Sequence, residues 1–310
     1  MTISERDVTA AQDAASVLAP GTLADETEAS PAIWQIAEET PVAVMLNSRS
    51  LAVMMATPAD LEDFGIGFAL SEGFLRSAEA VRNVLVLPHD RGFAVDIAAD
   101  EAAILPREVP RRAMEGRSGC GLCGVDEIEA VVRPLPEVEP VALGAKAVRL
   151  AFGELPAHQP MNRVNHSVHA AAWCDLSGTV QFAREDVGRH CALDKLVGAM
   201  GRTGVDPREG FVAMSSRLSF ELVQKAATVG IGAIATISAP TSLALAIAAE
   251  AGVSVASASG SKVMLFQQGG VCASRRSHLS HRFHRCFRGV NAWPRAPFGR
   301  SGETYFRGQI

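Results

Sequence analysis

The sequence predicts an α/β protein, with a core lobe of alternating strands and helices and a smaller N-terminal α+β lobe. The chain has 310 residues, enough for two lobes, because domains commonly hold about 100–200 residues. Hydrophobic residues make up 48% of the chain, and this fraction argues against general disorder. In the second half, strand-like and helix-like segments alternate regularly, which indicates a covered sheet that is at least partly parallel.

The first part of the chain divides into a leader and the N-terminal lobe. Residues 1–30 are rich in Ala, Thr, Asp and Glu without periodicity, and we expect a disordered leader there. The N-terminal lobe is expected over 31–140. It opens with a hairpin around Asn47, and Thr57 is predicted to cap the following helix, with Pro58 in its first turn. The predicted strands are 42–47, 51–56, 81–87 and 92–97, and the helix is expected to end near Gly73.

A glycine-rich stretch in this lobe, 116–125, holds Cys120 and Cys123. Glycine lets the backbone take positive φ and approach another molecule closely. Apolar residues at helical spacing follow, so we expect a loop that runs into a helix N-terminus. A thiol at such a position ionises more easily, because the helix dipole favours negative charge there.

Three chemistries compete for this cysteine pair: a nucleophilic thiol, half of a zinc site, and a redox dithiol. Zinc needs further ligands, for which His166 and His169 are candidates. Cys174 and Cys191 occur singly, and Cys174 is expected to be buried. No strand directly precedes the loop, which disfavours a thioredoxin-type site. The glycine frame and the absence of a second cysteine pair favour the reactive thiol over zinc.

The second lobe is expected over 141–266, after a proline-containing linker. Gly230 and Gly252 are predicted to end helices. The predicted strands are 179–183, 211–215, 233–237 and 253–256, and the predicted helices include 193–200, 218–229 and 241–251.

A charged run, 184–195, lies at a predicted strand-to-helix junction of this lobe. Arg184, Arg189 and Lys195 could bind phosphates there, and His190 could transfer protons. The alternative is a cluster of ion pairs at a helix start, the commoner explanation for isolated charges.

Hydroxyl-rich loops follow the next two predicted strands, at 215–219 and 238–242. Ligands in open α/β sheets commonly bind at the carboxyl ends of strands. Ser216 and Arg217 in the first loop therefore suggest a phosphate or nucleotide pocket, although each loop alone resembles an ordinary helix cap.

Residues 267–310 are aperiodic and rich in arginine, with Glu303 as their lone acid. We expect an irregular basic tail rather than a nucleic-acid-binding arm, because a basic tail without a folded nucleic-acid-binding motif has little specificity for nucleic-acid sequence. No secretory leader or membrane span is recognisable. We therefore expect a cytoplasmic protein whose cysteines are reduced.

Taken together, several stretches resemble the FdhD family, the formate dehydrogenase accessory sulfurtransferases. The similarity runs from about Ile36 to Val255 in the order of the family. The matching stretches are 39–44 (Glu-Thr-Pro-Val-Ala-Val), 57–62 (Thr-Pro-Ala-Asp-Leu-Glu), 67–73 (Gly-Phe-Ala-Leu-Ser-Glu-Gly), 120–124 (Cys-Gly-Leu-Cys-Gly), 169–172 (His-Ala-Ala-Ala), 184–190 (Arg-Glu-Asp-Val-Gly-Arg-His), 192–195 (Ala-Leu-Asp-Lys), 216–219 (Ser-Arg-Leu-Ser), 223–225 (Val-Gln-Lys) and 238–242 (Ser-Ala-Pro-Thr-Ser).

The resemblance implies a cytidine-deaminase-like fold for the second lobe and a sulfur-transfer function. Such a protein accepts sulfur as a persulfide from a cysteine desulfurase. It passes this sulfur to the molybdenum cofactor, in its bis guanine dinucleotide form, before insertion into formate dehydrogenase. Cys120 would carry the persulfide and Cys123 would assist or relay it. A homodimer is expected, with no nucleic acid, membrane or resident metal.

The resemblance also implies where the cofactor would bind. The expected binding residues are Ala258, Ser259, Gly260, Ser261, Lys262 and Val263, together with Arg184, Arg189, His190, Ser216 and Arg217.

Two other functions stay open. One is a zinc-dependent hydrolase, which needs a His-x-Glu motif ahead of the cysteine pair. Here the histidine motif, His169-Ala170-Ala171, lacks the glutamate and follows the pair. The other is a non-catalytic cofactor chaperone, in which the cysteines only help binding.

Overall fold

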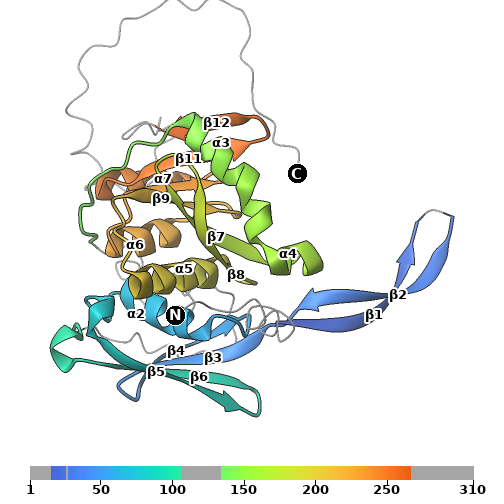
Figure 1. The fold of residues 1–310 in the computed structure, drawn as a ribbon, viewed down its shortest axis with the longest axis horizontal. Coiled ribbons are helices and arrows are strands. Elements are labelled where there is room, and N and C mark those ends of the chain that lie inside the picture. Colours follow the sequence, from blue (N-terminus) through green and yellow to red (C-terminus); the bar gives the residue numbers. More distant parts are fainter. Residues whose placement is uncertain (1–14, 26, 107–133, 267–310) are drawn as a thin grey trace, which may run out of the picture. The chain divides into compact units, whose positions relative to one another are not determined.

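The structure is a computed structural model that describes residues 15–25, 27–106 and 134–266 (Figure 1). The described residues form a mixed α/β fold with three sheets. The predicted loop and helix around Cys120 and Cys123 lie outside the described residues, and so does the predicted tail 267–310. None of the described helices is long and apolar enough to cross a membrane.

The central sheet has six strands in the order β12-β11-β10-β9-β7-β8. Strands β9, β10 and β11 run parallel, while β7 is antiparallel to both of its neighbours and β12 is antiparallel to β11. The strands are β7 (His169–Asp175), β8 (Val180–Asp186), β9 (Gly210–Met214), β10 (Ala233–Thr236), β11 (Ser254–Ser259) and β12 (Lys262–Phe266). The predicted covered, partly parallel sheet is therefore confirmed.

Helices cover both faces of this sheet. Successive side chains of a strand point to opposite faces, and β7 shows the result. Ala171 and Trp173 join the apolar cluster with α5, α6 and α7, whereas Ala170 and Ala172 join the cluster with α3. The helices of this lobe are α3 (Ala145–Glu154), α4 (Pro160–Asn165), α5 (Arg189–Thr203), α6 (Phe220–Thr228) and α7 (Ser242–Ala251), with the 3₁₀ turn η4 (Leu155–His158).

The N-terminal lobe contains a four-stranded sheet in the order β4-β3-β6-β5. Its strands confirm the hairpin predicted around Asn47 and the two further predicted strands, and its helix ends at Ser71, close to the predicted Gly73. The elements are β3 (Thr40–Leu46), β4 (Arg49–Ala56), α2 (Leu61–Ser71), η1 (Ala78–Ala80), β5 (Val81–His89), β6 (Gly92–Ala99) and η2 (Glu101–Ala103).

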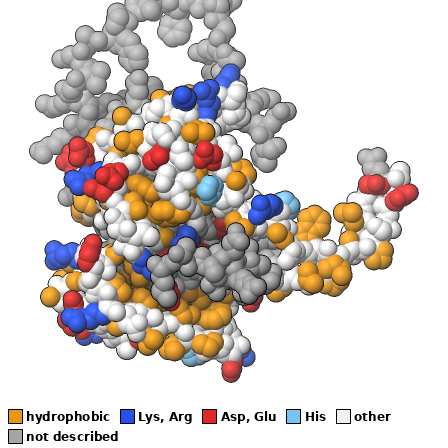
Figure 2. All heavy atoms as spheres, viewed as in Figure 1, with side chains coloured by type: hydrophobic (Ala, Val, Ile, Leu, Met, Phe, Trp, Pro, Cys, Tyr) orange, Lys and Arg blue, Asp and Glu red, His pale blue; other side chains and the backbone are white. Residues whose placement is uncertain are grey.

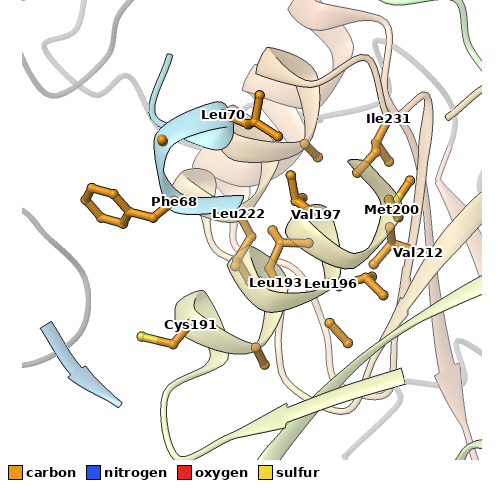
Figure 3. Close-up of a cluster of buried hydrophobic side chains, with 14 of the residues drawn as sticks. Phe68, Leu70, Cys191, Leu193, Leu196, Val197, Met200, Val212, Leu222 and Ile231 are labelled. Carbon is orange, nitrogen blue, oxygen red and sulfur yellow. The ribbon is translucent and has the colours of Figure 1, made fainter. Parts of the chain in front are cut away.

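One apolar core connects the two predicted lobes. Figure 3 shows Leu193 and Val197 of α5 close to Leu222 of α6 and Leu70 of α2. Helices α2 and α5 touch through their backbones, because a methyl group on Gly67 would overlap the carbonyl oxygen of Asp194. The hydrophobic core thus continues across residue 140, where the lobe boundary was expected.

The predicted cap of α2 is wrong. Asp60 precedes the helix with a left-handed φ of 51°, and no side chain caps the first turn. The hydroxyl oxygen of Thr57 instead accepts a hydrogen bond from the Val187 backbone N–H at 3.1 Å. Thr57 is therefore used to hold the loop after β8 against the N-terminal lobe.

The predicted disordered leader also needs correction. Part of it forms strand β1 (Ser16–Ala24), which pairs along its length with β2 (Ala29–Ala37). The hairpin carries exposed apolar side chains along both strands, as Figure 2 shows, including Leu18, Ile33 and Trp34. These apolar residues do not alternate regularly with polar ones, so the sequence pattern did not predict the two strands. Residues 1–14 lie outside the described part.

Candidate functional site

Those predicted site residues that the structure describes gather at one edge of the central sheet, which we call the carboxyl edge. Strands β8, β9, β10 and β11 all end there, because β8 and β9 are both antiparallel to β7. Strand β7 begins there, since His169 pairs with Asp186 at the end of β8. Helices α5, α6 and α7 therefore start at this edge, and their positive dipole ends favour negatively charged groups.

Much of the charged run 184–195 holds the fold together instead of facing solvent. The Lys195 side chain is fully buried, and its Nζ lies 2.7 Å from Asp186 Oδ2. The same ammonium donates to the backbone carbonyl oxygens of Thr57 and Glu185. Asp186 also accepts from the backbone N–H of Thr57 at 3.0 Å and of Gly188 at 2.8 Å. Lys195 thus fixes the start of α5 and is too enclosed to meet a phosphate.

Arg184 is bound to the N-terminal lobe. Its Nε and Nη2 each lie 2.8 Å from Asp63 Oδ2 of α2, and its Nη1 donates to the carbonyl oxygen of Ala183. The charge-assisted hydrogen bond and the ion pair to this one carboxylate oxygen hold the guanidinium in place. A cofactor phosphate would have to displace Asp63, so the predicted role of Arg184 in cofactor binding stays a prediction.

A second buried ion-pair network, which the sequence did not suggest, lies between α2, α5 and α6. Lys225 Nζ lies 2.8 Å from Asp194 Oδ1 and 3.0 Å from Glu72 Oε1. The hydroxyl of Ser71 donates to Asp194 at 2.6 Å. Although burial opposes it, the carboxylates of Asp194 and Glu72 raise the pKa of Lys225, so this ammonium stays charged. One feature of the sequence could have indicated this network: Lys225 lies among the apolar residues of the predicted helix 218–229.

His190 sits beside Arg189 at the start of α5 and is almost fully buried. Burial, followed by the nearby cations of Arg189 and Lys225, lowers the pKa of His190 to about 3. Burial and Arg189 also lower the pKa of His169. Both imidazoles are therefore biased toward the neutral form, which can donate through one nitrogen and accept through the other.

The loops after β9 and β11 contribute groups of different exposure. Ser216 is buried and its hydroxyl donates to the carbonyl oxygen of Arg217, whose own side chain is exposed. At the end of β11, Ala258 is buried, while Ser259, Gly260, Ser261 and Lys262 form an exposed turn that leads to half-buried Val263. Gly260 has a φ of 55°, which suits glycine in this tight turn. The predicted cofactor residues at 216–217 and 258–263 thus lie on a loop, a turn and the adjoining strand ends of one edge.

The described cysteines are unsuited to thiolate chemistry. Burial raises the pKa of Cys174 to about 12, and it raises the pKa of Cys191 well above its usual range. The prediction that Cys174 is buried is confirmed. Cys120 and Cys123 lie outside the described residues, so no distance links them to the carboxyl edge.

The two histidines considered for zinc are not part of a metal-binding cluster in the described segments. His166 is exposed just after α4, and His169 is half-buried at the start of β7. Among residues 15–25, 27–106 and 134–266, no group of His, Cys, Asp and Glu side chains is placed to hold a metal ion.

Comparisons with known proteins identify relatives over most of the chain. Residues 37–269 match the model of the FdhD/NarQ family. The sulfur carrier protein FdhD of Bordetella petrii is 46% identical over 71% of this chain and 80% of its own length. That of Chromobacterium violaceum is 47% identical over 72% and 84%. A Desulfotalea psychrophila crystal structure, described as a formate dehydrogenase accessory protein, aligns with a TM-score of 0.66 and 26% identity over 81% of this chain and 96% of that one. The fold, the ordered motifs and these relatives together show that the chain belongs to the FdhD/NarQ family.

Proposed function

We propose that this chain is a sulfur carrier that serves formate dehydrogenase, with Cys120 as the residue that carries the sulfur. The observation that carries the proposal is the location of its cysteines. Four of the six cysteines lie within the family match at 37–269. Two of these, Cys174 and Cys191, are buried with raised pKa values. Thiolate chemistry within the family region therefore falls to Cys120 and Cys123.

The first step would load sulfur onto the carrier. The Cys120 thiolate attacks the terminal sulfur of a persulfide on a cysteine desulfurase. The sulfur–sulfur bond of the donor breaks, its cysteine leaves as a thiolate, and Cys120 becomes a persulfide. Glycines at 119, 121 and 124 would leave room for a large partner.

The second step would release the sulfur. If the Cys123 thiolate attacks the inner sulfur of the Cys120 persulfide, hydrosulfide leaves and a disulfide forms between the two cysteines. The sulfur atom is thereby reduced to sulfide, and a thiol reductant of the cytosol would restore both thiols. In this scheme Cys123 is the residue that releases the sulfur from Cys120.

The acceptor would be the molybdenum cofactor in its bis guanine dinucleotide form, held at the carboxyl edge. Two observations support this placement. Helices α5, α6 and α7 begin at this edge, where their N-termini attract phosphates. Exposed Arg217 and the exposed turn 259–262 lie on loops of the same edge. The cofactor is cargo here, and Cys120 would approach it from the loop that carries the cysteines.

A zinc-dependent hydrolase has no supporting observation, because the histidine motif lacks its glutamate. A non-catalytic chaperone predicts a different outcome for one variant. If Cys120→Ala still matures formate dehydrogenase in cells, then sulfur transfer by Cys120 is refuted. Loss of that maturation, with the Cys120→Ala protein still folded, supports the sulfur carrier. The proposal also includes a cytoplasmic homodimer, which light scattering of the purified protein would test.

A further inference from the structure

The β1–β2 hairpin forms a separate two-stranded sheet with an exposed apolar surface. Neither strand contains a charged residue. Four of its large apolar side chains are between 40% and 60% exposed: Val17, Leu23, Trp34 and Ile36. A two-stranded ribbon has no core of its own and is only marginally stable in water. Its exposed apolar surface therefore indicates a binding partner.

The register of the hairpin places these four side chains on one face, which we call the tryptophan face. Successive residues of a strand point to opposite faces, and directly paired residues share a face. From the base of the hairpin to its tip, the pairs on the tryptophan face are Val17–Ile36, Ala19–Trp34, Gly21–Ala32 and Leu23–Ser30. The opposite face carries Leu18 and Ile33. The tryptophan face is therefore the larger apolar surface.

Two prolines favour contact through a face over contact through a strand edge. Pro20 lies in β1 and Pro31 in β2. Proline lacks the N–H that pairing with a further strand requires, and within sheets it occurs with that side facing away from the ladder. Each outer edge of the ribbon therefore lacks a donor along its length, which disfavours the addition of a strand from another protein.

Gly21 lies in the middle of the tryptophan face, and its own chain does not require a glycine there. Its φ is not positive, and a methyl group placed on it would meet no atom within 4 Å. A glycine inside a strand costs stability and often marks a close approach of another backbone or ligand. Because Ala32 pairs with Gly21, only small groups occupy this part of the face.

A second copy of the same face fits this open space. In a twofold interface a surface contacts itself, so the base of one ribbon lies against the tip of the other. The pairs Ala19–Trp34 and Gly21–Ala32 lie on opposite sides of the middle of the face and equally far from it. A twofold axis through the middle therefore brings the large Trp34 side chain over Gly21 and Ala32 of the other copy. Large side chains facing small ones is the arrangement that packs without voids.

We propose that the tryptophan face is a homodimer contact, in which Trp34 of one protomer packs over Gly21 and Ala32 of its partner. The exposed area of this face is on the order of 500 Å² per copy, so the contact buries about 1,000 Å² in total, the lower limit for a specific interface. A dimer held by this contact is therefore weak, with a micromolar dissociation constant. The inference rests on the homodimer included in the proposed function, and it names the surface that forms it.

Analytical ultracentrifugation of the full chain over a range of concentrations tests this contact. We expect reversible dissociation of the wild-type dimer. Trp34→Ala should weaken the dimer at least about 30-fold, as expected for a central aromatic residue of an interface. Gly21→Val fills the open space and should weaken it at least about tenfold. Because valine favours a strand more than glycine does, this second loss cannot come from unfolding of the hairpin.

Variants on the opposite face are the matched controls. Ile33→Ala and Thr22→Val should change the dimer affinity by less than about threefold. Wild-type affinity in both Trp34→Ala and Gly21→Val would overturn the inference, and so would an equal loss in the control variants. A wild-type chain that stays monomeric up to about 100 µM would also overturn it, because the micromolar dimer expected from the buried area would then be absent.

Sulfur loading of the same proteins separates this inference from the proposed sulfur transfer. A wild-type chain that acquires sulfur at Cys120 but stays monomeric would overturn the dimer contact alone. A wild-type dimer that Trp34→Ala weakens, in a chain that acquires no sulfur, would overturn the sulfur carrier alone.

Discussion

The buried ammonium of Lys195 offers the sharpest test of how the carboxyl edge is held in place. We consider Lys195→Met, which removes the charge and keeps most of the side-chain volume. The substitution deletes the 2.7 Å ion pair to Asp186 and the hydrogen bonds to the Thr57 and Glu185 carbonyl oxygens. It leaves the fully buried Asp186 carboxylate with only two backbone N–H donors.

The expected loss follows from the partner left behind. Removing one member of a buried ion pair costs about 3–5 kcal/mol, because the other charge stays buried and uncompensated. Backbone donors to Asp186 offset part of this loss, so we expect about 3 kcal/mol. Lys146→Met on the exposed side of α3 is the control and should change stability by less than about 0.5 kcal/mol.

Urea unfolding measures the difference. The unfolding midpoint of Lys195→Met should fall while the slope stays the same, since the folded structure exposes the same surface. Adding Asp186→Asn to Lys195→Met should recover part of the loss, because it removes the uncompensated charge. A loss below about 1 kcal/mol for Lys195→Met, or no recovery in the double variant, would refute the reasoning.

Three further predictions concern acid stability, helix packing and sulfur release. The folded pKa of His190, about 3, lies below its ordinary value of 6.5. The unfolded chain therefore binds the proton first, and this site loses stability as pH falls below about 6.5. The free energy of unfolding, measured in urea, should fall less between pH 7 and pH 5 for His190→Gln than for wild type. The exposed control His89→Gln should match wild type. An equal fall for all three proteins would contradict this. Gly198→Ala should cost more than about 2 kcal/mol, because its methyl would overlap the carbonyl oxygen of Asp63. Gly153→Ala, which meets open space on α3, should not destabilise, and circular dichroism melts compare the two. Cys123→Ala should load sulfur yet release it slowly, so that the persulfide accumulates in mass spectra; release at the wild-type rate would exclude the relay role.

Alternation of strands and helices made the second lobe predictable, because apolar periodicity reports burial directly. Strand β7 was missed, since its His-Ala-Ala-Ala-Trp-Cys-Asp sequence lacks the β-branched residues that mark strands. Its alanines lie between β8 and β9, with helices packed on both faces, where close packing favours small side chains. The β1–β2 hairpin was missed for a different reason, because its apolar residues do not alternate regularly with polar ones along either strand.

The charged motif 184–195 shows where sequence reasoning could not decide. Composition alone left phosphate binding and ion pairing open, and the structure places Arg184 and Lys195 in ion pairs with Asp63 and Asp186. The partner Asp63 is distant in the sequence, so only the tertiary fold reveals it.

The central claim is that Cys120 carries sulfur, and peptide mass spectrometry tests it most directly. The full chain is incubated with a cysteine desulfurase and cysteine, then digested without reductant. We predict one added sulfur atom on the peptide that contains Cys120, and none on that peptide in Cys120→Ala. Sulfur found instead on Cys272 or Cys286, or on no cysteine at all, would contradict the account.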